Sequence, residues 1–206
     1  MSFVTKGVIK NGLIVFMCAA AIWMVAYLPL SSDARFSIAV ILFLLAGLYF
    51  RWFRMFIRGG HAEIDVLSAL QELPEEYVVG SNLVLGQRGD IDVYVVGPTG
   101  IWAIEVKSNR TWIKRISPFV KKCIRQAHAE AYALRDFLKE GLGKEFKVQP
   151  VVVFSHADVR LGPKPIEGVY VVGVAWLRDI ILQAPTSLNP TDMESIKAEI
   201  RSKLDK

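Results

Sequence analysis

The sequence predicts an α/β domain built around a mixed β-sheet, with a pair of apolar helices in front of it. Three observations support this prediction. Residues 12–30 contain no charged side chain, and a second apolar run follows almost directly. After residue 59, stretches with helical and strand-like apolar periods alternate. A Gly-Pro-Thr-Gly turn at residues 97–100 joins two apolar stretches, as expected of a strand hairpin.

The two apolar runs have the length of membrane-spanning helices. The run from Gly12 to Leu30 would be about 28 Å long as a helix, close to the hydrocarbon thickness of a bilayer. The second run extends from Phe36 to Phe50. We therefore expect residues 1–58 to form a two-helix transmembrane hairpin. A cleaved signal peptide and a pair of core helices are the alternatives. The presence of a second apolar run argues against a signal peptide, and the charge-free stretch argues against core helices.

Basic residues set the expected orientation of this hairpin. Lys6 and Lys10 precede the first run, and Arg51, Arg54 and Arg58 follow the second. Positively charged flanks stay in the cytoplasm, so both termini and the globular domain are expected on the cytoplasmic side of the cell membrane, in a multi-pass protein. The formal net charge of +5 suits either a nucleic acid or an anionic membrane surface.

The expected globular domain spans residues 59–206 and begins after a Gly59-Gly60 junction. Its expected elements are a helix over 61–73, strands over 77–85 (with a turn at 80–82), 91–96 and 101–107, an irregular basic segment over 108–118, a helix over 119–138, strands over 148–154 and 169–174, and helices over 176–183 and 191–204. This order indicates a mixed sheet flanked by helices.

Three charged residues fall in the two strands joined by the turn, Asp92 in the first and Glu105 and Lys107 in the second. Residues two apart on a strand share a face, and the short turn brings Asp92 alongside. Buried charges are costly unless they pair or hold a metal. The two carboxylates and the Val106 carbonyl would suit a hard divalent cation, and the ammonium could act on a water or a phosphate. An ordinary salt bridge on a solvent-facing sheet is the alternative, but the apolar run 101–104 is typical of a central strand.

The segment from Gly89 to Ser108 resembles the signature of the nuclease-related domain (NERD), a branch of the PD-(D/E)XK nuclease superfamily. The resemblance covers about residues 60–180. It implies a restriction-endonuclease-like fold that hydrolyses DNA phosphodiester bonds with Mg²⁺, or with Mn²⁺. It assigns the metal-binding and catalytic roles to Asp92, Glu105 and Lys107, and it extends to Glu63 on the first helix and to Gln126.

The chain departs from the family pattern at two places. Ala62 stands where the family usually has glycine, and residues 108–112 lack the usual glycine-containing hairpin. Glu63 could bind a second metal, hold a water or be a solvated helix residue. Gln126 could hydrogen-bond the attacking water or Lys107, or it could face solvent.

The stretch from Lys107 to Arg125 is rich in basic residues and contains no acid. Trp112 and Phe119 are interleaved with these charges, a pattern that suits phosphate contacts and base stacking. Attraction to anionic lipid headgroups is the alternative. The candidate nucleic-acid contacts are Arg110, Trp112, Lys114, Arg115, Lys121, Lys122 and Arg125.

Three functions are consistent with these patterns. The first is a membrane-anchored, Mg²⁺-dependent endonuclease that acts on DNA, with a homodimer as an option because many enzymes that cut both strands are dimers. The second is a non-catalytic, membrane-tethered module that binds nucleic acid or protein. The intact Asp92, Glu105 and Lys107 argue against it, because a degenerate site would tolerate their loss. The third is a structural membrane adaptor, whose acids would be salt-bridged among themselves.

Overall fold

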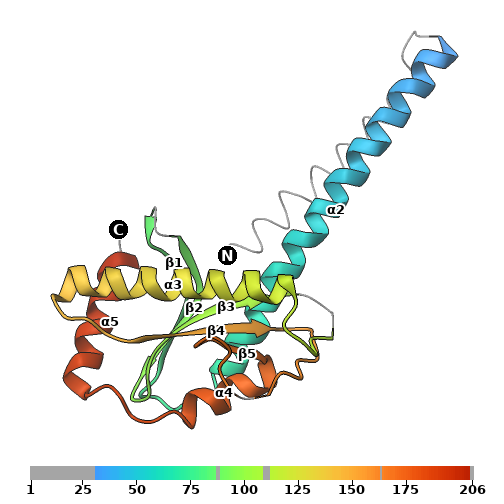
Figure 1. Ribbon diagram of the computed structural model, residues 1–206. Coiled ribbons are helices and arrows are strands. Elements are labelled where there is room, and N and C mark those ends of the chain that lie inside the picture. Colours follow the sequence, from blue (N-terminus) through green and yellow to red (C-terminus); the bar gives the residue numbers. More distant parts are fainter. Residues whose placement is uncertain (1–30, 87–88, 109–111, 163, 205–206) are drawn as a thin grey trace. The chain divides into compact units, whose positions relative to one another are not determined.

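The computed structural model describes residues 31–86, 89–108, 112–162 and 164–204 of the 206-residue chain (Figure 1). The chain divides into two units, Met1–Gly60 and His61–Lys206. The expected first apolar helix, residues 12–30, lies outside the described residues, together with Lys6, Lys10 and Arg110.

The first described helix, α2, runs from Ser32 to Leu70. Its segment Ser32–Arg51 has a mean hydropathy of 1.8 and is long and apolar enough to cross a membrane. Large apolar side chains such as Phe36 and Phe43 are exposed there, at 73% and 71%. Among the described residues this is one candidate span, so the structure does not show the two-helix hairpin that the sequence predicts.

The helix α2 differs from the prediction at the expected domain junction. It continues through Gly59-Gly60, where a break was expected. Each glycine inside a helix lowers the stability of that helix by about 1 kcal/mol relative to alanine. Neighbouring residues with high helix propensity can offset this loss. The helix also ends at Leu70, three residues before the expected end.

Five strands form one mixed sheet in the described part of the chain, in the order β1-β2-β3-β4-β5. Their bounds are Val78–Val84, Asp90–Gly97, Gly100–Lys107, Val148–Phe154 and Tyr170–Gly173. The pairs β1–β2 and β2–β3 are antiparallel, whereas β3–β4 and β4–β5 are parallel. The predicted mixed sheet is therefore confirmed, with β3 in the centre.

The predicted turn at residues 80–82 is wrong, because β1 is continuous. Gly80 pairs with Tyr94 on the neighbouring strand, and a side chain at residue 80 would collide with the Tyr94 ring. The glycine therefore makes room for an aromatic ring and does not turn the chain. The β2–β3 hairpin does close as expected, with Gly97 paired to Gly100, whose φ of +129° suits glycine.

Three further helices complete the unit, α3 (Pro118–Leu142), α4 (Val174–Leu182) and α5 (Pro190–Leu204). Helix α3 is capped at its start by Ser117, whose Oγ accepts a hydrogen bond from the Val120 amide at 3.3 Å, and at its end by Gly143 in the left-handed conformation. Helices α3 and α5 pack on one face of the sheet, and α4 and the end of α2 pack on the other. Figure 1 shows α3 running along one side of the sheet and α4 lying on the other.

Candidate active site

The candidate site lies where strands β2 and β3 separate. Their last paired residues at this end are Val93 and Ile104. The same register would next place Asp92 opposite Glu105, but the ladder stops there. Instead, the Val106 amide donates a hydrogen bond to Asp92 Oδ2 at 2.9 Å. The ladder thus ends in a gap between β2 and β3, with Asp92 bonded to the Val106 amide and Glu105 one residue before Val106.

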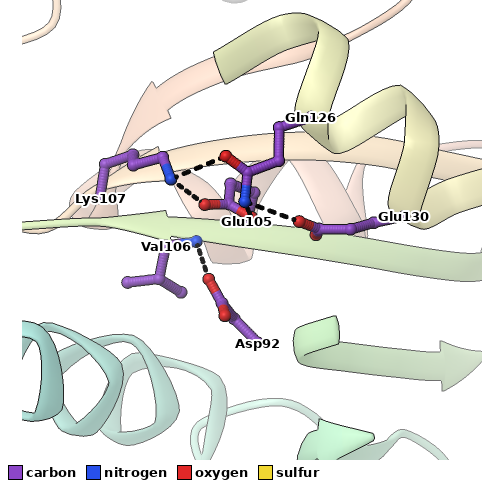
Figure 2. A network of polar contacts seen from close by, with 6 residues as sticks. All are labelled: Asp92, Glu105, Val106, Lys107, Gln126 and Glu130. Carbon is purple, nitrogen blue, oxygen red and sulfur yellow. Dashed lines mark hydrogen bonds and ion pairs between the residues drawn. The ribbon is translucent and has the colours of Figure 1, made fainter. Parts of the chain in front are cut away.

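A hydrogen-bonded network surrounds Glu105 (Figure 2). The Lys107 ammonium forms an ion pair with Glu105 Oε1 and also donates to Gln126 Oε1 at 3.1 Å. The Gln126 Nε2 atom donates to Glu105 Oε2 at 2.8 Å. Glu105 and Lys107 therefore share one face of β3, as the strand period predicts, and that face is covered by α3.

This burial excludes the solvent-facing salt bridge that the sequence left as an alternative. The Glu105 side chain is 2% exposed and the Lys107 side chain 23% exposed. Asp92 accepts its hydrogen bond from a backbone amide, whereas Glu105 is paired with a lysine. The adaptor hypothesis predicts that both acids are salt-bridged. Glu105 meets this prediction, whereas Asp92 does not, because its partner is a backbone amide.

Asp92 lies in a strongly negative environment. Burial raises the pKa of its carboxyl from 3.8 to about 6, and the nearby charges of Glu105 and Glu63 act in the same direction. The Val106 amide and the Lys107 ammonium oppose this rise only in part. A second positive charge at this place would thus be stabilising.

Burial lowers the pKa of the Lys107 ammonium, but the hydrogen bond and the charge of Glu105 outweigh that effect, so its pKa is raised overall. Lys107 is therefore protonated at neutral pH while it is paired in this way. In this state it can stabilise negative charge on a phosphate or orient a water through a hydrogen bond. It cannot take up a proton until its pairing with Glu105 changes.

Glu63, on the last part of α2, lies close enough to the site to interact with its charges. Burial raises the pKa of the Glu63 carboxyl, a hydrogen bond with Asn82 lowers it, and the charge of Glu105 raises it. Glu63 is thus half-buried beside β1 rather than fully solvated. Asn82, with a positive φ of 55°, was not expected to contribute.

Glu130 on α3 is the site residue that the sequence reasoning missed. It is 6% exposed, and its Oε1 accepts from Gln126 Nε2 at 3.3 Å. Burial, the hydrogen bond with Glu105 and the charges of Glu105 and Asp92 raise the pKa of Glu130 to about 10. The buried Oε2 atom has no hydrogen-bond partner among the described residues, and its burial away from water favours the protonated acid. The signal was available, because Glu130 lies on the helix face of Ala127 and Leu134.

A second polar chain follows β4. Ser155 continues the strand, and its amide donates to the Lys107 carbonyl at 3.0 Å. The Ser155 Oγ atom lies 2.5 Å from His156 Nδ1, and His156 Nε2 lies 3.7 Å from Asp65 Oδ2. The serine and the histidine are neighbours in sequence, and no strained strand-to-helix turn presents the hydroxyl, so this chain does not indicate a serine hydrolase.

The predicted nucleic-acid contacts are exposed wherever the structure describes them. Trp112, Lys114 and Arg115 lie in the segment between β3 and α3. Lys121, Lys122 and Arg125 lie on the first turns of α3, on the side away from the sheet. Gln126 directly follows this basic side, so the exposed cations adjoin the network around Glu105.

No group of three or more His, Cys, Asp or Glu side chains that could hold a metal ion occurs among the described residues. A cation at this place would therefore rely on Asp92 and Glu105 together with carbonyl, water or phosphate oxygens. Mg²⁺ is commonly bound in this way, through one or two carboxylates and the substrate phosphate. The buried, mutually repelling carboxyl groups fit such an ion.

The five-stranded mixed sheet with its flanking helices is an α/β fold that fits a nuclease-like architecture. The family model of the nuclease-related domain (NERD) matches residues 58–155. This stretch is therefore similar to a nuclease-related domain and supports a nuclease-related function that involves nucleic acid. It includes Glu63, Asp92, Glu105, Lys107, Gln126 and Glu130. No significant match occurs among curated proteins or among solved structures.

Proposed function

We propose that this chain is a Mg²⁺-dependent nuclease that hydrolyses phosphodiester bonds of DNA at a membrane surface. The observation that carries the proposal is the position of Asp92, Glu105 and Lys107 at the point where β2 and β3 separate. The match of residues 58–155 to the nuclease-related domain supports the same reaction class.

Asp92, Glu105 and the Val106 carbonyl would hold the cation. In an extended strand, the N–H and C=O groups of one residue point toward the same neighbouring strand. Because the Val106 N–H points to Asp92, its carbonyl borders the same gap. Bound Mg²⁺ supplies Lewis acidity for the phosphate oxygens, and Mn²⁺ can take the same oxygen ligands.

The other residues of the network would prepare the site for substrate. With a cation at Glu105, Lys107 would lose part of its ion pair to this residue, and its ammonium could turn to the scissile phosphate or the attacking water. Gln126 holds both side chains and so limits where Lys107 can move. Glu63, which the charge of Glu105 reaches, would hold a water or a second cation.

The exposed cations would bind the DNA backbone next to this site. Lys121, Lys122 and Arg125 adjoin Gln126 on α3, and Lys114 and Arg115 precede that helix. Contacts of this kind position the backbone without reading the sequence. The exposed apolar segment Ser32–Arg51 would anchor the chain in a bilayer, with the basic residues after it on the cytoplasmic side.

The test is cleavage of supercoiled plasmid by the full-length protein in detergent, with Mg²⁺, Mn²⁺ or EDTA. We expect nicking or linearisation with either metal and none with EDTA. Asp92→Asn, Glu105→Gln and Lys107→Ala should each abolish cleavage, because each removes a ligand or the site's ammonium. Glu194→Gln, at a side chain that is 70% exposed on α5, is the matched control and should cleave normally.

Binding assays separate this function from a non-catalytic module on the same fold. DNA binding without metal-dependent cleavage would overturn the enzymatic proposal in favour of the binding module. Cleavage that survives Glu105→Gln would overturn the assignment of the site. Flotation of the full chain with liposomes, compared with a chain in which residues 32–51 are replaced by a polar linker, tests the membrane anchor.

A further inference from the structure

Residues 112–119, which precede and begin α3, form an aromatic and basic surface. A groove of about 640 Å³ lies along it and is lined by Trp112, Lys114, Arg115 and Phe119, among other residues. The Trp112 side chain is 64% exposed and Phe119 is 41% exposed. Exposed apolar surface that is bordered by charged side chains is typical of an interaction site.

The Trp112 ring is contacted by two cations that come from separate loops. The Lys114 Nζ atom lies 4.7 Å from the centroid of the Trp112 ring, and the Arg160 guanidinium carbon lies 4.9 Å from it. Arg160 follows β4 and lies beyond the matched nuclease-related stretch. The sequence reasoning did not include it, because its position beside Trp112 depends on tertiary contacts.

The backbone holds this cluster in place. The Ile113 amide donates to the Asp158 carbonyl, and the Arg160 amide donates to the Ile113 carbonyl, each at 2.9 Å. Ile113 itself is 5% exposed and packs in the core with Val120 and Phe154. Asp158 also pairs with the Arg160 guanidinium at 2.7 Å. Residues 112–114 and 158–160 are thus joined into one preformed surface.

We propose that this surface binds an unpaired nucleotide of the DNA, with the base against Trp112 and Phe119 and the phosphates at Lys114, Arg115 and Arg160. Inside a duplex, the faces of a base are covered by its neighbours, so an exposed aromatic ring finds a free face only on an unpaired base. The surface has the matching charge, because it carries Lys114, Arg115 and Arg160, and the acid Asp158 is already paired with Arg160. The proposal rests on the proposed function and adds that the substrate carries a single-stranded segment.

The test compares binding of a fluorescein-labelled oligothymidylate and a hairpin duplex of equal length to the full-length protein, in EDTA so that no hydrolysis occurs. We expect tighter binding of the single strand. Trp112→Ala should weaken it roughly ten-fold or more, the loss typical of one stacked base, whereas Trp112→Phe should largely retain it. Trp176→Ala is the matched control, because this other tryptophan is 57% exposed on α4.

Salt dependence tests the phosphate contacts. Arg160→Ala and Lys114→Ala should each reduce the slope of log affinity against log salt by about 0.7, the single-strand value for one phosphate contact. Arg178→Ala, which removes another ion-paired arginine, should leave the slope unchanged.

Equal binding by Trp112→Ala, or a preference for the duplex, would overturn the inference. Trp112-dependent binding to anionic vesicles without oligonucleotide binding would also overturn it, in favour of a lipid contact. Plasmid cleavage reports on the nuclease proposal separately, so either proposal can fail while the other stands.

Discussion

The amide group of Gln126 on α3 donates to Glu105 Oε2 on β3 at 2.8 Å. Its oxygen accepts from the Lys107 ammonium at 3.1 Å, so one side chain forms hydrogen bonds with both Glu105 and Lys107. A glutamine suits this position because it carries a donor and an acceptor on the same planar group. An acid at residue 126 would repel Glu105, and an apolar residue would leave both partners short of a hydrogen bond.

Substitution of Gln126 should therefore lower the rate of cleavage more than the affinity for DNA. We expect Gln126→Ala to reduce kcat about 10- to 100-fold with little change in KM, the usual effect of losing a residue that orients a ligand. Gln183→Ala, at an exposed glutamine that ends α4, is the control and should leave both constants unchanged. An unchanged kcat in Gln126→Ala would show that Lys107 and Glu105 are held in place by other contacts.

Glu130 gives a prediction about stability in the metal-free protein. Its pKa is raised to about 10 by burial and by the nearby acids, so the folded state keeps a proton that the unfolded state releases above about pH 4.5. Stability is therefore lost progressively as the pH rises from that value toward 10. Glu130→Gln mimics the protonated acid and should raise the thermal midpoint at about pH 8, with a smaller gain near pH 4. Glu130→Ala should lower the midpoint at both, because it leaves a cavity. A lower midpoint for Glu130→Gln at about pH 8 would contradict a neutral Glu130.

The raised pKa of Asp92 predicts how cation binding depends on pH. The folded pKa of about 6 lies above the ordinary value of 3.8, so the metal-free protein loses stability as the pH rises between these values. A bound cation reverses this loss, because it stabilises the ionised carboxylate. The rise in thermal midpoint caused by Mn²⁺ should therefore be larger at about pH 8 than at about pH 5, measured in the full-length protein. Asp92→Asn should remove most of the rise at the higher pH, and a rise independent of pH would indicate a cation bound elsewhere.

Much of the sheet could be predicted because its signals are local. The apolar runs and the glycines at residues 97 and 100 define β2, β3 and their hairpin, and the alternation of side chains places Glu105 and Lys107 on one face. The proximity of Asp92 to this pair follows from the short turn. These features depend on residues near one another in the chain, so they can be predicted from the sequence alone.

The remaining features depend on contacts between distant segments. Glu130 sits on a helix face whose other residues read as ordinary core, and its pKa is raised by burial and by Glu105, which β3 brings close to it. Arg160 reaches Trp112 through the pairing of two loops that are separated by a helix and a strand. Residues 59–60 read as a break, although the helix continues through them. A glycine indicates a turn only where no neighbouring side chain needs the space that a larger residue would fill.

Gly80 is such a glycine, and its substitution tests whether the neighbouring ring requires it. It was expected in a turn, but it lies inside β1 opposite Tyr94, a buried residue whose ring occupies the space of a side chain at residue 80. A methyl group there would displace the ring from the core that α3 and α5 cover. Gly80→Ala should therefore destabilise the protein by about 1–3 kcal/mol, seen as a lower thermal midpoint. Gly47→Ala is the control, since a methyl group at residue 47 meets nothing within 4 Å. In a Tyr94→Leu background, the substitution at Gly80 should cost less, because the smaller side chain leaves room. An equal cost in both backgrounds would mean that the ring is not the reason for the glycine.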